Sequence, residues 1–169
     1  MKKERGVALK AEMEQWQSVI LENRAKYYRL AYSYVKNEHD ALDIVQESLY
    51  KALRDYSKMR DEDAIKTWFY RIVVNTALNF IKKSKRVVYM NEAQWNALPG
   101  ESEEDAVSLR DAVDSLPPRD KTVVTLRYFE DMKIGDIAKV LQENENTIKT
   151  RLYAALKKLK VSVLREQEV

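Results

Sequence analysis

Cations and an aromatic side chain recur at helical spacing near the end of the chain, at Lys149, Tyr153, Lys157 and Lys160. Apolar residues repeat with the same period on another face of the same predicted helix. A helix that buries one side and presents cations and a ring on the other suits a DNA groove. The chemistry predicted for this helix is therefore nucleic-acid binding. The apolar stripe consists of Ile148, Leu152, Ala155 and Leu159.

A second group of polar and aromatic residues lies within residues 66–83, where Asn75 and Asn79 share one face of a predicted helix with nearby lysines. Asn amides can read base edges, and lysines neutralise phosphate. The aromatic residues offer flat surfaces on which separated bases stack, although an aromatic residue at helical spacing usually packs in a core. The lysines are Lys82 and Lys83, and the aromatic residues are Trp68, Phe69 and Tyr70.

Acidic side chains gather where another predicted helix begins. They could dock a basic partner helix, or Asp40 and Asp43 could simply complement the helix dipole, and composition leaves both interpretations open. Asp40 is also the predicted N-cap of this helix. The group consists of Glu38, Asp40, Asp43, Gln46 and Glu47.

Composition excludes several kinds of site. The chain has 169 residues and no Cys, so disulfides, zinc–thiolate sites and Cys nucleophiles are ruled out. His39 is the only histidine, and no Gly-rich phosphate loop or Ser-His-Asp set is found. No apolar run reaches the length of a membrane span. We expect a soluble, cytoplasmic protein without metal, cofactor or small-molecule substrate, and an enzyme is the least favoured class.

The elements that must position these groups are helices, because the chain has only three Gly and three Pro and little strand-like alternation. The first half predicts helices over about residues 9–35, from Asp40 onward, and over about 64–83. The polar stretch 57–63 between the last two is a predicted loop. The apolar positions of the second helix are Leu42, Val45, Leu49, Ala52 and Leu53.

The second half predicts a helix-turn-helix. Pro117-Pro118 should open a helix, since Pro is tolerated in a first turn. A supporting helix is expected to follow around residues 134–141, then a short turn and a last helix capped by Asn144. The apolar side of the opening helix consists of Val123, Val124, Leu126 and Phe129, and the supporting helix is formed by Ile134, Ile137, Ala138, Val140 and Leu141.

Charge divides the chain into three blocks, although the total is only +3. Residues 1–86 carry a net +6, residues 87–114 a net −6, and residues 115–169 a net +3. Basic blocks favour phosphate backbones through counterion release, and an acidic block is repelled from DNA. The linker is predicted at roughly residues 90–105, within the acidic block, and contains the breaker Pro99-Gly100.

Three segments in this order resemble the sigma-70 family of bacterial RNA polymerase initiation factors, extracytoplasmic-function subgroup. The resemblance covers about residues 20–160. Its most specific parts are DALDIVQESLYKAL (40–53), TWFYRIVVNTALNFIKKSKR (67–86) and the segment from LPPRDKTVV to LKKLK (116–160).

The resemblance implies an all-α fold of two small domains joined by a flexible acidic linker. Sigma region 2 would span residues 1–89, the linker 90–112, and sigma region 4 with its helix-turn-helix 113–169. Such proteins bind core RNA polymerase and direct it to promoters. The subgroup also implies control by an anti-sigma factor, often membrane-bound.

The same resemblance assigns roles to individual residues. The −35 promoter element would be read by Lys149, Thr150, Arg151, Tyr153 and Lys157. A flipped base of the −10 element would be captured by the loop that holds Met59, Arg60 and Asp61. The −10 DNA would be read and opened by Trp68, Arg71, Asn75, Asn79, Lys82 and Lys83. The clamp helices of the largest catalytic polymerase subunit would meet Asp40, Asp43, Gln46 and Glu47.

Some positions depart from the family pattern. Gln142 and Glu143 stand where Gly and an apolar residue are common, Asn146 where Gly is frequent, and Ala154 where Arg is common. The change at Ala154 removes one expected DNA contact. The first 20 residues have no place in the pattern. A rival reading, a stand-alone helix-turn-helix regulator that binds operators as a dimer, lacks an obvious dimerisation helix.

Overall fold

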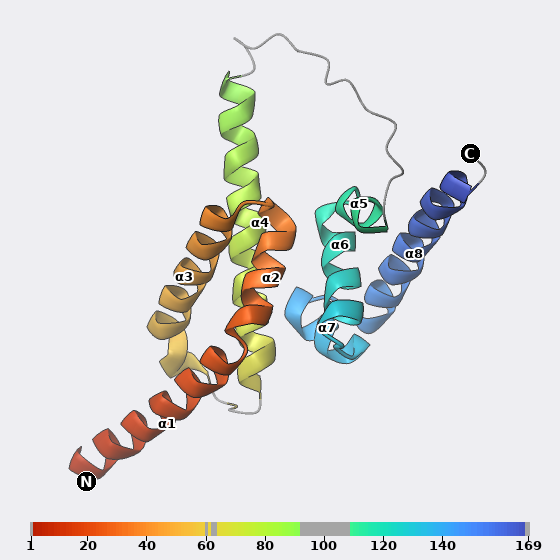
Figure 1. The fold of residues 1–169 in the computed structure, drawn as a ribbon. Coiled ribbons are helices and arrows are strands. Elements are labelled where there is room, and N and C mark those ends of the chain that lie inside the picture. The colour runs from red at the N-terminus through yellow and green to blue at the C-terminus, as the bar shows by residue number, and fades with distance from the viewer. Residues whose placement is uncertain (1, 60, 62–63, 92–108, 168–169) are drawn as a thin grey trace. The chain divides into compact units, whose positions relative to one another are not determined.

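The computed structural model describes the backbone of residues 2–59, 61, 64–91 and 109–167, and helices make up most of it (Figure 1). No strand occurs in these ranges, so the predicted all-α class is confirmed for the described part of the chain. The chain divides into an N-terminal unit, Met1–Ala77, and a C-terminal unit, Leu78–Val169. The division falls inside helix α4 (Ile65–Asn91), so the predicted domain boundary at residue 89 stays a prediction.

The predicted first helix is in fact two helices, α1 (Lys2–Glu22) and α2 (Arg24–Val35). They are divided at Asn23, whose backbone has φ −101° and ψ 7° and whose side-chain amide donates to the carbonyl oxygen of Val19 at 2.8 Å. A short polar side chain of this kind competes with regular helical bonding. The prediction of one continuous helix was therefore wrong. The error arose because the apolar residues keep their helical spacing across the break.

Helix α3 (Glu38–Asp55) begins earlier than predicted. Its N-cap is Asn37, whose side-chain oxygen accepts a hydrogen bond from the backbone N–H of Asp40 at 3.0 Å. The prediction that Asp40 is the cap was therefore wrong. Asp40 is a residue of the first turn, where its charge complements the helix dipole.

The core of the N-terminal unit includes residues from α2, α3 and α4. Tyr27 is fully buried, and its ring meets those of Phe69 and Tyr70 edge to face, with centroids 4.6 and 4.8 Å apart. Such pairs add to the free energy gained by burying the rings. Phe69 and Tyr70 are thus packing residues, the alternative that the sequence left open for these aromatics. Other buried members of this core are Leu30, Ala31, Ala41, Ile44, Val73 and Val74.

Helix α4 runs eight residues beyond its predicted end at Lys83. The prediction ended it at a run of cations, which suits a helix C-terminus, but no Gly or Pro stops the chain there. Most of the predicted linker, residues 92–108, lies outside the described residues. Its last residues belong to α5 (Leu109–Asp114).

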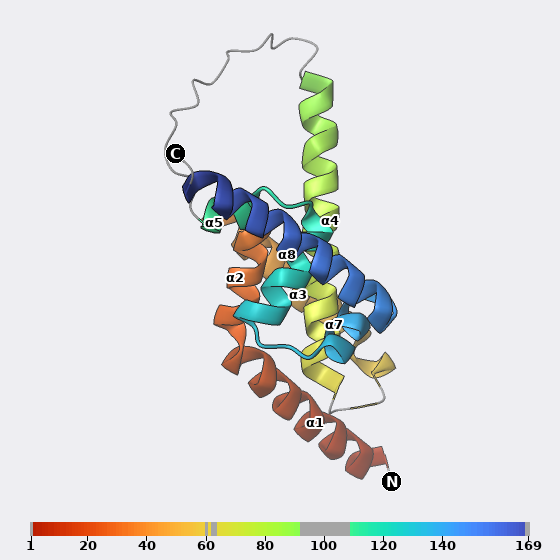
Figure 2. The ribbon, with the colours of Figure 1, turned by 90° about the vertical axis from the view of Figure 1, so that its right-hand side faces the viewer.

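The C-terminal unit confirms the predicted helix-turn-helix. Helix α6 (Pro118–Val124) opens at the predicted proline pair, with Pro117 as N-cap. It continues into a π-helical turn, η3 (Thr125–Phe129), followed by α7 (Ile134–Leu141) and the long α8 (Glu145–Gln167). In Figure 2, α8 runs along this unit, and it contacts α5, α6 and α7.

One residue of the apolar side predicted for the helix that Pro117-Pro118 opens lies on the surface. Val123, Val124 and Leu126 are buried as expected, whereas Phe129 is 67% exposed. The π-helical turn places more residues in one turn than an α-helix does. This shifts Phe129 off the face that helical periodicity predicts.

The turn between α7 and α8 places Gln142 in the left-handed region, at φ 55° and ψ 40°. A side chain with a Cβ is disfavoured there, whereas glycine is not. Gln142→Gly is therefore expected to raise the free energy of unfolding of the C-terminal unit by about 1 kcal/mol. Urea denaturation measures it, with Gln142→Ala, which keeps the Cβ, as the matched control. Equal stability of the two variants would contradict the account.

Candidate nucleic-acid and polymerase interfaces

Helix α8 is positioned by its cap and its apolar stripe. The Asn144 side-chain oxygen accepts hydrogen bonds from the backbone N–H and the hydroxyl of Thr147, at 2.8 and 3.0 Å, which confirms the predicted cap. The predicted stripe is buried. Because one face is fixed against the unit, the opposite face must point outward. The buried stripe consists of Ile148, Leu152, Ala155 and Leu159.

Four of the five predicted −35 residues are exposed: Lys149, Thr150, Tyr153 and Lys157. Tyr153 is 70% exposed, unusual for so large a ring. Two ammonium groups, a hydroxyl and a phenol on one side of a helix can meet phosphates and base edges. Four residues that the sequence assigned to DNA binding are therefore accessible to a ligand on the surface of α8.

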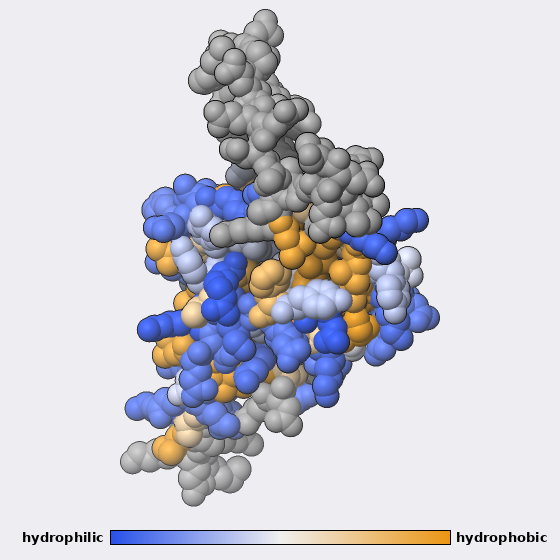
Figure 3. Space-filling view, turned by 45° about the vertical axis from the view of Figure 1, so that its right-hand side comes forward, coloured by the Kyte–Doolittle hydropathy of each residue, from blue (hydrophilic) through white to orange (hydrophobic). Residues whose placement is uncertain are grey.

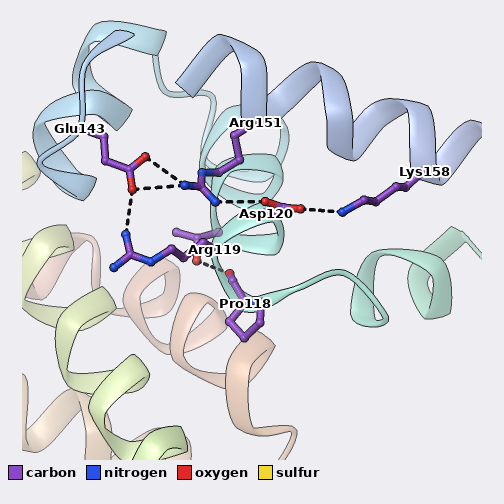
Figure 4. Close-up of polar contacts among 7 residues, drawn as sticks. Pro118, Arg119, Asp120, Glu143, Arg151 and Lys158 are labelled. Atoms are coloured by element: carbon purple, nitrogen blue, oxygen red, sulfur yellow. Dashed lines mark hydrogen bonds and ion pairs between the residues drawn. The ribbon is translucent and has the colours of Figure 1, made fainter. Parts of the chain in front are cut away.

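The fifth predicted −35 residue, Arg151, faces the inside of the C-terminal unit (Figure 4). Its guanidinium lies 3.3 Å from the Asp120 carboxylate on α6 and 3.4 Å from the Glu143 carboxylate in the turn. Its Nε atom is buried. The role of Arg151 in reading DNA stays a prediction, but these contacts commit its side chain to intramolecular partners.

Arg151 belongs to a larger charge network that the sequence did not predict. Lys158 on α8 lies 3.1 Å from the second oxygen of Asp120, and Arg119 on α6 lies 2.8 Å from Glu143 (Figure 4). The Asp120 and Glu143 side chains are only 12% and 17% exposed, so each carboxylate needs its cations. The network ties α6, the turn and α8 together. The one sequence signal was the unusual acid at Glu143.

The predicted −10 residues of α4 form one helical face. Trp68 and Arg71 are half-buried, and Asn75, Asn79, Lys82 and Lys83 are exposed. Amides and ammonium groups therefore follow one another along an accessible strip of α4. This strip lies on the opposite side from Val73, Val74 and Ala77, which are in the core.

The loop before α4 is only partly described. Met59, half-buried, follows the short 3-10 helix η1 (Tyr56–Lys58), and Asp61 is exposed. Arg60, also predicted to contact the −10 element, lies outside the described residues. Nearby, a hydrogen bond from Arg54 and then one from Lys58 lower the pKa of Asp55 to about 2. Asp55 therefore stays a carboxylate at every pH relevant to DNA binding.

The predicted polymerase-binding residues lie along α3. Asp40 is half-buried, while Asp43, Gln46 and Glu47 are exposed. Asp43 has His39 as a partner at 3.7 Å and Glu47 has Lys51 at 2.7 Å, both one helical turn away. Both carboxylates are half in solvent, so these pairs hold them only weakly and leave them available to a partner.

The exposed face of α3 is more apolar than the sequence predicted. Leu42, Tyr50 and Leu53 are 50%, 66% and 47% exposed, whereas the residues in the core are Ala41, Ile44, Ser48 and Ala52. Leu42 and Leu53, two of the apolar positions named from the sequence, therefore lie on the surface of α3. The face drawn in Figure 3, in which α3 is not identified, is mainly hydrophilic, with hydrophobic residues in areas between the polar ones. Exposed apolar side chains with a polar rim are typical of a protein-binding surface.

Within the residues that the structure describes, no cluster of His, Asp or Glu side chains is arranged to hold a metal ion. None of the helices in these residues has a stretch long and apolar enough to cross a bilayer.

Comparison with known proteins places both units. Residues 19–87 match the family described as Sigma-70 region 2, and residues 106–159 match Sigma-70, region 4. The chain is 45% identical to RNA polymerase sigma factor SigV of Bacillus subtilis (strain 168), over 87% of this chain and 90% of that protein. It is 26% identical to ECF RNA polymerase sigma factor SigW of the same organism, over 85% and 86%.

A solved structure with a similar fold is that of the sigma factor RpoE in complex with the anti-sigma factor NepR from Bartonella quintana. It aligns with a TM-score of 0.73 and 19% identity, over 89% of this chain and 97% of that one. The two sigma regions match in the predicted order, and the similarity to SigV extends over 90% of that protein. The chain belongs to the sigma-70 family of RNA polymerase sigma factors, in the extracytoplasmic-function subgroup.

Proposed function

We propose that this chain is a promoter-specificity subunit that binds core RNA polymerase and directs it to promoters, and is not itself an enzyme. The observation that carries the proposal is the exposed polar face of α8, which a capped turn and a buried stripe hold outward. The chain would act in the cytoplasm, where bacterial polymerase meets DNA. The proposed domains are region 2 over residues 1–89 and region 4 over 113–169.

In this proposal the −35 element is read by Lys149, Thr150, Tyr153 and Lys157. The exposure of all four supports this assignment. Arg151 acts differently: it holds α8 against Asp120 and Glu143 and so sets the angle at which the other four meet the groove.

The −10 element is read and opened by the strip along α4, from Trp68 to Lys83. Unstacking and flipping a base costs a few kcal/mol. Stacking on an aromatic ring and hydrogen bonds to the exposed amides of Asn75 and Asn79 offset that cost. Met59, Arg60 and Asp61 are proposed to hold the flipped base.

Core polymerase docks on α3 through Asp40, Asp43, Gln46 and Glu47, and the exposed Leu42 and Leu53 widen this surface. An anti-sigma factor is proposed to regulate the chain by covering the same face. The similar fold of RpoE, solved with NepR, supports such a partner.

Asp43→Lys is expected to weaken association with core polymerase about tenfold, because it reverses a charge that must meet a basic partner. Folding should be unaffected, since the His39–Asp43 pair is solvent-exposed. A pull-down titration with purified core polymerase measures the affinity. Glu12→Lys, the same charge change at an exposed residue of α1, is the control. Unchanged affinity for Asp43→Lys would remove α3 from the docking face.

Run-off transcription with purified core polymerase on a bacterial promoter library tests the function itself. Transcripts that appear only with this chain, from templates sharing a −35 and −10 pair, are expected. No transcripts, together with tight duplex binding by the chain alone, would favour a stand-alone regulator instead.

A further inference from the structure

We propose that Trp16 of α1 is a positioning residue for −10 promoter DNA: it sets the placement of Trp68 and of the η1 turn that leads to Met59. The inference rests on the proposed function, because it assumes that Trp68 and Met59 meet the −10 element. Trp16 lies before residue 19, where the match to sigma region 2 begins.

The indole of Trp16 is 2% exposed and contacts two aromatic rings. Its centroid lies 5.3 Å from that of Tyr56, at an interplanar angle of 59°, and 6.4 Å from that of Trp68, at 54°. Tyr56 is the first residue of η1, and Trp68 lies in the first turn of α4. One side chain therefore touches both elements that flank the segment 59–64.

This contact fixes the face that Trp68 shows to a ligand. Trp68 is half-buried, so one part of its ring is covered and the rest is accessible. Trp16 supplies part of that cover. Without it, the Trp68 ring gains space to leave its orientation on the helical face that also carries Arg71 and Asn75. A stacking platform that must first be ordered binds more weakly than one already in place.

The role of Trp16 is one of shape and not of hydrogen bonding. Its Nε1 atom is buried and has no acceptor among the described residues. A buried indole normally finds such a partner, so its N–H does not explain why Trp stands here. A smaller aromatic ring should therefore replace it in large part, whereas a methyl group should not.

The rest of α1 makes this residue easy to isolate. The neighbouring Glu14, Gln15, Gln17 and Ser18 are exposed, and the inward-facing residues of this stretch are Trp16 and, one turn later, Ile20. Among the described residues, Tyr27 pairs with the rings of Phe69 and Tyr70, whereas Trp16 pairs with those of Tyr56 and Trp68, so the two groups share no ring pair. Loss of the Trp16 ring should thus leave the core around Tyr27 and Phe69 folded.

The test uses full-length Trp16→Ala, Trp16→Phe and Val7→Ala, each assembled with core polymerase. Val7 is 70% exposed on the same helix and is the matched control. The probe is a fork-junction DNA carrying the promoter found by run-off transcription. It is duplex through the −35 element and single-stranded, in the non-template strand, across the −10 element. A second probe carries only the −35 duplex, and polymerase affinity is measured in parallel.

Trp16→Ala is expected to bind the fork probe about tenfold more weakly while its affinities for the −35 duplex and for core polymerase are unchanged. Trp16→Phe should bind within about threefold of the parent, and Val7→Ala should equal it. Fork binding by Trp16→Ala equal to the parent would overturn the inference. So would a loss shared equally by both probes and polymerase and not rescued by Trp16→Phe, since that pattern indicates general unfolding.

A further variant covers the case in which Trp16→Ala fails to fold. Trp16→Leu keeps an apolar side chain but removes the ring, and it should bind the fork probe more weakly than Trp16→Phe; equal binding would overturn the inference. Failure of the proposed function is recognised separately, because the parent chain would then give no transcripts with core polymerase at all.

Discussion

The double variant Lys149→Ala/Tyr153→Ala is expected to lose about 100-fold in initiation from promoters that depend on a −35 element. Each lost contact to a base or phosphate costs about 1–3 kcal/mol, and 1.4 kcal/mol is a factor of ten. Folding should survive, because both side chains are exposed and the buried stripe of α8 is untouched. Run-off transcription at fixed salt measures the loss, since phosphate contacts weaken as salt rises.

The matched control is Lys26→Ala/Tyr128→Ala, which removes the same residue types from exposed positions elsewhere on the chain. It should initiate like the parent. Affinity for core polymerase should not change in either double variant. If the Lys149→Ala/Tyr153→Ala variant lost polymerase binding to the same degree as initiation, the division of labour between α8 and α3 would be wrong.

Arg151→Ala is expected to lower the free energy of unfolding of the C-terminal unit by about 1–3 kcal/mol. It strips one cation from two carboxylates that are mostly buried. The loss is smaller than for an isolated buried pair, because Lys158 still faces Asp120 and Arg119 still faces Glu143. Hydrogen exchange should therefore accelerate in α6 and α8.

Peptide-resolved hydrogen exchange suits this prediction because it reads each unit separately. Peptides of α2 and α3 should exchange as in the parent, which provides an internal reference. Lys157→Ala removes an exposed cation from the same helix and is the control for lost charge. Arg151→Lys should be intermediate, since an ammonium cannot bridge two carboxylates as a guanidinium fork does. Protected α6 and α8 in Arg151→Ala would show that the network adds nothing to stability.

The predictions that held in the C-terminal unit rest on local chemistry. The proline pair opened α6, Asn144 capped α8, and the apolar stripe of α8 was buried. Each of these depends on one residue type or on a period of a few residues, which any stretch of chain shows without its neighbours. The exposure of Lys149, Tyr153 and Lys157 follows directly, because it is the complement of the stripe.

The predictions that failed depended on partners distant in the chain or on competing local bonds. Not every apolar position of α3 faces the core: Leu42 and Leu53 are exposed, whereas Ala41, Ile44 and Ala52 are buried. Phe129 left its predicted face because a π-helical turn shifted the register. Apolar periodicity predicted one continuous helix, but the chain forms two helices that are divided at Asn23. Periodicity shows that a helix has an apolar side, but the packing partner decides which residues it covers.

The sequence by itself determined the helical class, the helix-turn-helix and the family, since periodicity, caps and ordered motifs are local properties of the chain. Only the tertiary structure decided that Arg151 turns toward Asp120, 31 residues earlier, while Lys149, Thr150 and Tyr153 on the same helix are exposed. It also decided that Trp16 meets Tyr56 and Trp68. The physical reason is the same in both cases: a buried charge or ring is placed by the groups that compensate or cover it, and folding brings these from elsewhere in the chain.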